Sequence, residues 1–266
     1  MINRSVLAVA AHPDDIEFVM AGTLLQLSQR GWAVHYFNIA NGCCGSTTLS
    51  RSQCAAVRLL EAQHAASLIP STFYPPICDD LEVFYTPSLL AKVSSVVRKA
   101  SPSIVLTHSL TDYMEDHQNA ARLAVGGVFT RSMPSVATEP PFSPFDHDVA
   151  IYHAQPHGNR DPMGCIVHPS HFVDVTLQID RKRELLAAHA SQDQWLETTQ
   201  KINAYLETMM QLNREVGEMS RRAAQKHHRM PYQYAEGWRQ HWHLGFSMAG
   251  FDPLTAALHD CIIKES

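Results

Sequence analysis

Two clusters of histidine and aspartate carry the side chains in this chain that could bind a metal ion. The first is Ala11-His12-Pro13-Asp14-Asp15, and the second runs from residue 107 to residue 117. In the first cluster, one carboxylate would suffice to cap a following helix. A second carboxylate crowded against the first, and beside an imidazole, is repelled by the first carboxylate unless a cation is present. The pattern therefore favours a cation held by His12 and one aspartate, with the other aspartate placed to accept a proton from water.

The second cluster contains Thr107-His108 and then Asp112-Tyr113-Met114-Glu115-Asp116-His117. Alone, it is typical of a polar loop that caps a helix. However, both clusters directly follow predicted strands, and the carboxyl ends of parallel strands meet at one edge of a sheet. A mixed set of histidine and carboxylate suits zinc, which in catalytic sites keeps three protein ligands and an open position for water. No C-x-x-C pair occurs among the six cysteines, so we do not expect a cysteine-rich structural zinc site.

The elements that would position these clusters alternate along the first half of the chain. Short apolar runs at 6–10, 33–39 and 104–107 predict buried strands. Helical spacing of apolar residues predicts helices over 16–27, 51–68, 89–100 and 117–129. This order predicts an α/β fold with a Rossmann-like, mostly parallel sheet flanked by helices. Further strands are expected at 150–153 and 172–175.

A long helix is predicted from residue 193 to about residue 225. Trp195, Ile202, Met209 and Val216 recur every seven residues along it. This pattern favours packing against another helix, either within the same domain or from a second subunit in a homo-oligomer. We therefore expect a single domain over residues 1–266, with an α/β core to about residue 192 and a helical C-terminal part from about 193 to 266.

The composition excludes several classes of protein. A formal charge of −5 and a pI near 6.3 argue against nucleic-acid binding. No run of 18 apolar residues predicts a membrane span. The N-terminal apolar stretch runs directly into charged residues without a signal-peptide cleavage site, and the cysteines do not suggest a disulfide framework. We therefore expect a cytoplasmic protein with reduced thiols.

Two segments resemble the signature motifs of the PIG-L/LmbE family of zinc-dependent N-deacetylases. AHPDDIE at 11–17 matches the family pattern A-H-P-D-D-x-E throughout, and VLTHSLTDYMEDH at 105–117 matches the pattern D-Y-H-P-D-H at four of six positions. Weaker matches extend over about residues 5–246. They are Arg58-x-x-Glu61, His189-x-Ser-Gln, and Tyr234-Ala-Glu-Gly-Trp.

The resemblance implies a role for each matching residue. His12, Asp15 and His117 would bind one Zn²⁺, or Fe²⁺ or another divalent ion, per chain. Asp14 would be the general base, and Asp116 would orient a neighbouring imidazole. Arg58 is a candidate for binding the substrate, although a solvated arginine on a helix face fits its position equally well.

This chain departs from the family at Met114, where the second motif has a histidine. That histidine is thought to stabilise the oxyanion or to protonate the leaving group, and methionine can do neither. His189 is our first candidate to replace it, and His108, a further candidate for contact with substrate, is the second. His153 and His157 are other possibilities.

The resemblance implies a hydrolase that removes an N-acyl group, most simply acetyl, from a small amino sugar or glycoside. One rival is a metal-containing subunit of the same fold that has lost catalysis and binds sugar or assists assembly; Met114 supports it, and the intact Asp14 argues against it. A dinucleotide-binding protein is a second rival. It is disfavoured because the first turn is acidic and lacks G-x-G-x-x-G.

Overall fold

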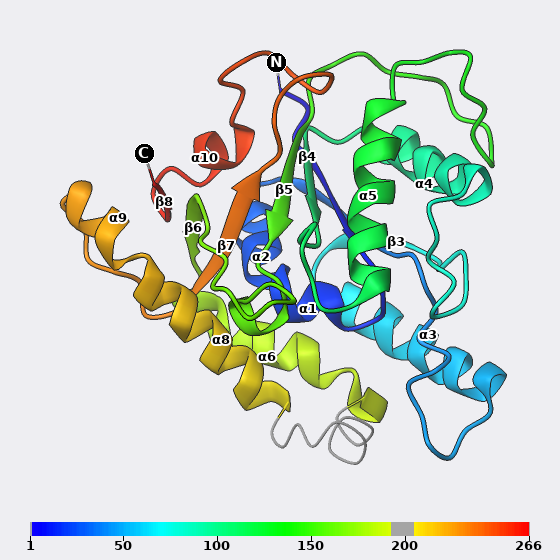
Figure 1. The fold of residues 1–266 in the computed structure, drawn as a ribbon, viewed down its shortest axis with the longest axis horizontal. Helices are drawn as coiled ribbons and strands as arrows, with labels where there is room; N and C mark the ends of the chain where they lie inside the picture. Colours follow the sequence, from blue (N-terminus) through cyan, green and yellow to red (C-terminus); the bar gives the residue numbers. More distant parts are fainter. Residues whose placement is uncertain (1, 193–204, 266) are drawn as a thin grey trace.

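A mixed β-sheet forms the centre of the molecule (Figure 1). The computed structural model describes residues 2–192 and 205–265. In this part of the chain, the sheet has eight strands in the order β3-β2-β1-β4-β5-β7-β6-β8. The strands are β1 (Ser5–Ala10), β2 (Ala33–Asn38), β3 (Ser71–Tyr74), β4 (Ile104–Thr107), β5 (Ala150–Ala154), β6 (His171–Asp174), β7 (Ala235–Gln240) and β8 (Ile262–Lys264).

The strands from β3 to β5 are parallel to one another, and β7, β6 and β8 continue the sheet with antiparallel pairings. The predicted α/β architecture is confirmed, and all five predicted strands are present within one or two residues. Both faces of β1 are buried, which explains its continuous apolar run. Its register with β4 places Val9 opposite Thr107, so the segments that follow the two strands leave the sheet side by side.

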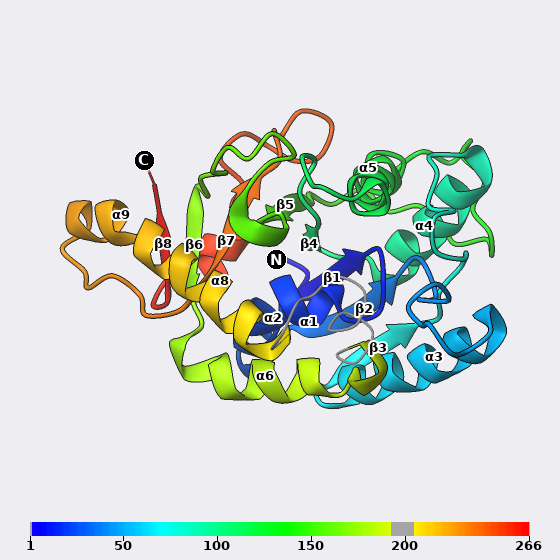
Figure 2. The same ribbon diagram turned by 60° about the horizontal axis from the view of Figure 1, so that its bottom comes forward.

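Helices cover both faces of the sheet (Figure 2). One face carries α1 (Asp15–Val19), α2 (Ala21–Gln29), α6 (Ile179–Ala187) and α8 (Tyr205–Met219), which share a core with Val6, Ala8 and Ala10. The other face carries α4 (Pro87–Ala100) and α5 (Glu115–Phe129), which pack on Leu7 and Val9. The alternation of buried side chains along β1 thus joins two cores. The remaining helices are α3 (Arg51–Ser67), α9 (Arg221–Lys226), α10 (Pro253–Ala257) and the short 3₁₀ turns η1 (His157–Asn159) and η2 (Thr176–Gln178).

The structure corrects the predicted elements in three places. The helix predicted over 16–27 is two helices, because the backbone leaves helical geometry at Met20. β3 was not predicted. The part of the chain after residue 192 is not wholly helical, since β7 and β8 return to the sheet from it. β7 escaped prediction because its buried Glu236 interrupts any apolar pattern. The partners of Glu236, which are Lys182 and the N–H groups of Gly22 and Thr23, lie far away in the sequence.

The long helix predicted from residue 193 corresponds to α8 and α9 where the structure describes it. Trp195 and Ile202 lie outside the described residues. Met209 and Val216 are buried, and α8 contacts β7 and β6. This face therefore packs on the sheet of its own chain. Among the described residues, none of the helices combines the length and apolar character of a bilayer-spanning segment.

A candidate metal centre at the strand ends

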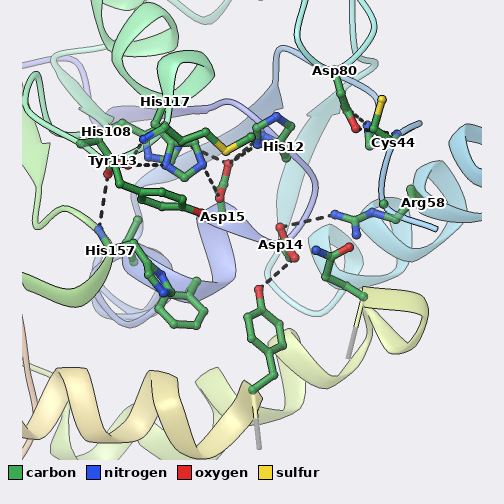
Figure 3. A pocket seen from close by; sticks show the side chains of 18 of the residues that line it. His12, Asp14, Asp15, Cys44, Arg58, Asp80, His108, Tyr113, His117 and His157 are labelled. Atoms are coloured by element: carbon green, nitrogen blue, oxygen red, sulfur yellow. Dashed lines mark hydrogen bonds and ion pairs between the residues drawn. The ribbon is translucent and has the colours of Figure 1, made fainter. Parts of the chain in front are cut away.

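The two sequence clusters lie together at the carboxyl ends of β1 and β4. The turn between β1 and α1 carries His12 and Asp14, and Asp15 is the first residue of α1. The segment between β4 and α5 carries His108 and Asp112. His117 projects from the first turns of α5 toward the same point (Figure 3). Because β1 and β4 are adjacent parallel strands, residues separated by about a hundred positions meet here.

His12, Asp15 and His117 form a compact group of potential metal ligands. Asp15 lies between the two imidazoles: Oδ2 is 3.4 Å from His12 Nδ1, and Oδ1 is 3.4 Å from His117 Nε2. One ligand atom from each residue lies within 4.8 Å of the others. His12 and His117 are buried and Asp15 is partly buried. The arrangement can supply three ligands and leave a fourth position open.

Each of the two histidines is held from behind by a carboxylate. His12 Nε2 lies 3.0 Å from Asp116 Oδ2, and His117 Nδ1 lies 2.9 Å from Asp112 Oδ1. When these outer nitrogens donate their N–H groups, the nitrogens that face Asp15 are free of a proton and can bind a metal. Asp116 thus lies where sequence reasoning expected it. Asp112 was not assigned a role, although its place five residues before His117 was the available signal.

The electrostatics of the group favour a cation. Burial alone would lower the pKa of His12, but hydrogen bonds to Asp116 and Asp15 raise it to about 9. Burial raises the pKa of Asp15, and the neighbouring His117 and His108 overcome this and lower it well below its usual range. Even with both imidazoles protonated, the three carboxylates leave an excess of negative charge in a buried place. A divalent cation would offset this excess, so the residues fit the expected metal.

Asp14 occupies a separate position on the cavity wall, and its backbone is left-handed, with φ of 92°. Its Oδ2 accepts a hydrogen bond of 2.9 Å from the Tyr205 hydroxyl, and its Oδ1 is 3.4 Å from Arg58 Nη2. Arg58 also donates to the Pro13 carbonyl oxygen. Burial raises the pKa of Asp14 against the opposing effect of Arg58. The carboxylate is therefore fixed by partners on both oxygens beside the ligand group.

His108 lines the cavity, and one nitrogen of its ring is already engaged by the backbone. It stacks on His117 with ring centroids 4.2 Å apart. Its Nε2 accepts the Ala11 backbone N–H at 3.0 Å and is 3.2 Å from Asp15 Oδ2. A nitrogen that accepts this N–H has no proton to donate. His108 can therefore contact substrate, but this nitrogen cannot serve as a proton donor.

His189 lies behind the cavity wall. It is 1% exposed, its Nε2 is 3.2 Å from Glu17 Oε2, and it does not line the cavity. Glu17, the last residue of the first motif, also accepts the Tyr36 hydroxyl. His189 therefore supports the helix that carries Asp14 and Asp15, and its placement does not suit direct proton transfer to a substrate.

A cavity of about 280 Å³ opens in front of the ligand group. Its walls include aromatic rings from distant parts of the chain. The ring of Phe18 stacks on the ring of Tyr205. The ring centroid of His157 lies 5.1 Å from that of Phe18 and 5.6 Å from that of Tyr113. Sequence reasoning did not identify Tyr113, Tyr205, Gln155 or Gln192, which also line the cavity. Tyr113 and Gln192 lie within motif matches that could have signalled them, whereas the contacts of Tyr205 and Gln155 depend on the tertiary fold and leave no local pattern in the sequence.

The first part of the chain matches a known protein family. The model of the PIG-L family, described as GlcNAc-PI de-N-acetylase, matches residues 7–126, which include His12, Asp15 and His117. This part of the chain is therefore similar to the PIG-L family. It is 27% identical over 196 residues to a diacetylchitobiose deacetylase of Thermococcus kodakarensis, covering 71% of this chain and 70% of that protein.

Other similar proteins have a different activity in their names. The chain is 25% identical over 230 residues to a 4-oxalmesaconate hydratase of Pseudomonas putida, covering 82% of this chain and 85% of that protein. The solved structure of a 4-carboxy-2-hydroxymuconate hydratase from the same organism superposes with a TM-score of 0.75 at 22% identity, covering 91% of this chain and 97% of that one. At this level of identity, the superposition shows that the two proteins share a fold.

Proposed function

We propose that this protein is a metal-dependent hydrolase that removes an N-acyl group, in the first place acetyl, from a small amino sugar or glycoside. The observation that carries the proposal is the convergence of His12, Asp15 and His117, with both outer ring nitrogens held by carboxylates, beside an intact Asp14. We assign one divalent ion per chain to these ligands, and zinc is our choice from the donor set. The deacetylase relative and the family model support the same reaction class.

When bound, such an ion would polarise the amide carbonyl and lower the pKa of water at its open position. Asp14 would accept the proton from that water and pass it to the departing amine. Tyr205 and Arg58 would hold its carboxylate in place for both transfers. A metal-containing subunit without catalysis would have no need of this fixed carboxylate.

The missing histidine at position 114 calls for another hydrogen-bond donor, and we assign this role to Tyr113. Its ring lies edge-on to His117 at 5.7 Å and next to Asp15 (Figure 3). Desolvation of the hydroxyl, reinforced by Asp15 and Asp112, raises its pKa, so the group stays protonated at neutral pH although the ring is exposed. A neutral phenol can donate to the developing oxyanion. His157, across the ring contact with Tyr113, is the second choice.

Hydration of a carbon–carbon double bond in a carboxylate substrate is the second candidate function. Met114 favours it, because an amide hydrolase of this family is expected to have histidine there, and the hydratase relatives support it. The charges on the cavity wall argue against it. The lining acids are Asp14, Asp15, Asp80 and Asp112, whereas Arg58 supplies the one guanidinium or ammonium among the described lining residues and already contacts Asp14. A neutral N-acyl sugar suits this wall better than a polyanion.

The proposal is tested by supplying zinc-loaded protein with a panel of N-acetylated sugars and glycosides and measuring released acetate. An unsaturated di- or tricarboxylate is included, and its hydration is followed by loss of ultraviolet absorbance. We expect acetate from at least one sugar, and Asp14→Asn should keep the metal while losing about 10²–10⁴-fold in kcat. Hydration of the carboxylate without acetate release would replace the proposal with the second candidate. Near-normal kcat in Asp14→Asn would refute the role of this carboxylate.

A further inference from the structure

A second group of metal-binding side chains lies on the wall of the same cavity. Cys43, Cys44 and Asp80 each offer a ligand atom within 4.8 Å of the other two. Cys43 and Asp80 are buried, and Cys44 is partly exposed where it lines the cavity together with Asp80. We propose that these three residues form a second metal site, which takes a thiophilic divalent ion such as Zn²⁺. The site does not depend on the proposed deacetylase activity.

The segment after β2 is built around the Asp80 carboxylate. Gly42 N–H donates to Oδ1 at 2.7 Å, and Cys44 N–H donates to Oδ2 at 2.8 Å. Gly42 has φ of 77°, and a Cβ there would lie 2.8 Å from Arg58 Nε, so only glycine permits this approach. The backbone of Gly42 and Cys44 thus fixes the acid beside the two thiols before any ion arrives.

The spacing of the two sulfur atoms matches ligands of a shared ion. Cys43 Sγ lies 3.9 Å from Cys44 Sγ. Zinc–sulfur bonds of ~2.3 Å in a tetrahedral site place two sulfurs about 3.8 Å apart, whereas a disulfide requires about 2.05 Å. Two cysteines that only fill space would also touch. Here, however, a buried carboxylate completes the group, and Cys44 borders the cavity through which an ion can enter.

The donor set defines the class of ion. Thiolates select Zn²⁺ and its soft analogues, such as Cd²⁺ and Co²⁺ used as probes, over Mg²⁺ or Ca²⁺. Each coordinating thiol releases its proton to solvent. Burial raises the pKa of Cys43 to about 11, so the ion must compete with protons and binds more tightly as pH rises. These properties fit a site that fills when thiophilic metal is in excess.

Occupation of this site would affect the cavity. Cys44 and Asp80 line it together with Arg58 and Gly45 (Figure 3). An ion bound to Cys44 and Asp80 would take up space beside Arg58, on the side of the cavity where a substrate would extend from the His12–Asp15–His117 group. Excess zinc should therefore lower turnover, while excess Mg²⁺ should not.

The test measures thiolate–metal bonds directly. Reduced full-length protein carrying His117→Ala, which disables the first site, is titrated with Co²⁺. We expect a thiolate-to-cobalt charge-transfer band in the near ultraviolet. The band should disappear in Cys43→Ser and Cys44→Ser and persist in Cys54→Ser, a matched control for a buried neighbouring thiol that donates instead to the Gly42 carbonyl. Absence of the band at saturating Co²⁺, or its persistence when both cysteines are replaced, would overturn the proposal.

A second measurement requires no substitution. Alkylation of individual cysteines in the wild-type protein is followed by mass spectrometry with Zn²⁺ or with Mg²⁺. Zinc should slow the modification of Cys44 by about tenfold or more, since a coordinated thiolate is not a free nucleophile. The exposed Cys165 should react at the same rate with either ion and serves as the internal control. Equal rates for Cys44 with the two ions would contradict the site.

Discussion

The chemistry of the first site depends on which nitrogen of each histidine is free of a proton. When Asp116 and Asp112 accept the outer N–H groups of His12 and His117, both rings can turn a nitrogen without a proton toward Asp15. The same pairing fixes the rotation of each ring. The two aspartates are therefore expected to contribute to metal affinity without touching the ion.

Replacing Asp112 by alanine should weaken metal binding by about 10–100-fold, because His117 loses the partner that fixes its tautomer. Replacing His12, Asp15 or His117 by alanine should instead abolish tight binding of one ion per chain. Competition with a chelator of known affinity measures the metal affinity of each variant and distinguishes a partial loss from a complete one. Asp260→Ala, an exposed aspartate paired with Arg30, is the control. Unchanged affinity in Asp112→Ala, or full occupancy in the three alanine variants, would contradict the assignment.

Tyr113→Phe should lower kcat by about 10²-fold or more with a smaller effect on KM, because the hydroxyl is assigned to a charge that develops in the transition state. The ring and its contact with His117 remain in this variant. His189→Gln, which alters a residue outside the cavity, should have a weaker effect on kcat and a clearer one on thermal stability. If His189→Gln lowers kcat and Tyr113→Phe does not, the donor was correctly predicted from sequence and our reassignment is wrong.

Among the secondary-structure elements, α8 brings the C-terminal part of the chain to the site. Its apolar side packs on β7 and β6, with Met209 fully buried, and its first turn carries Tyr205 to Asp14. The seven-residue recurrence of apolar residues reflects this packing within the chain. Burial of the helix thus positions a side chain of the site.

Met209→Lys should destabilise the fold by roughly 3 kcal/mol or more, because an unpaired ammonium would enter an apolar core. Thermal unfolding measures the loss. Gln211→Lys, which places the same charge on the exposed side of α8, is the matched control and should leave the melting temperature nearly unchanged. A stable Met209→Lys protein would show that this face is not held against the sheet.

Sequence patterns predicted the elements whose apolar residues form a continuous run or recur with helical spacing. β1 and β4 have continuous apolar runs, and α3 has a Ser50–Gln53 capping box followed by helical spacing. The residues of the first site were predictable because both motifs combine ligand types with strand ends. β7 was not, since the buried Glu236 reads as solvent-exposed until Lys182 and the N–H groups of Gly22 and Thr23 are known to contact it. The role of Tyr205 was not predictable either, because its contact with Asp14 spans 191 positions of the chain.

Across the whole molecule, one carboxylate joins the antiparallel half of the sheet to its parallel half. Asp252, at the start of α10, accepts hydrogen bonds from Tyr152 on β5 and Lys264 on β8, and lies 3.0 Å from His171 on β6. Burial alone would raise its pKa, but these three partners lower it far below the usual range. The position of the last strands therefore depends on an ionised Asp252.

Asp252→Asn should lower the free energy of unfolding by about 2 kcal/mol near neutral pH. The sign of the pH dependence follows from the lowered pKa. The unfolded carboxyl takes up a proton near pH 4 while the folded one stays ionised, so the wild-type advantage is present above about pH 4 and shrinks below it. Urea unfolding at a series of pH values measures this gap. The exposed Asp146→Asn should show no such gap, and a gap for Asp252→Asn that stays constant down to about pH 2 would contradict the linkage.

The two walls of the cavity come from different parts of the sequence. The candidate ligands, the carboxylates behind them and Asp14 all come from the segment that matches the family model, residues 7–126. Gln155, His157, Gln192 and Tyr205, which shape the opposite wall, come from later in the chain. Substitutions in the later segment can alter which molecule is admitted while the reactive centre is inherited intact. The later segment is therefore the part of the chain in which substitutions should change the choice of substrate without removing the candidate ligands.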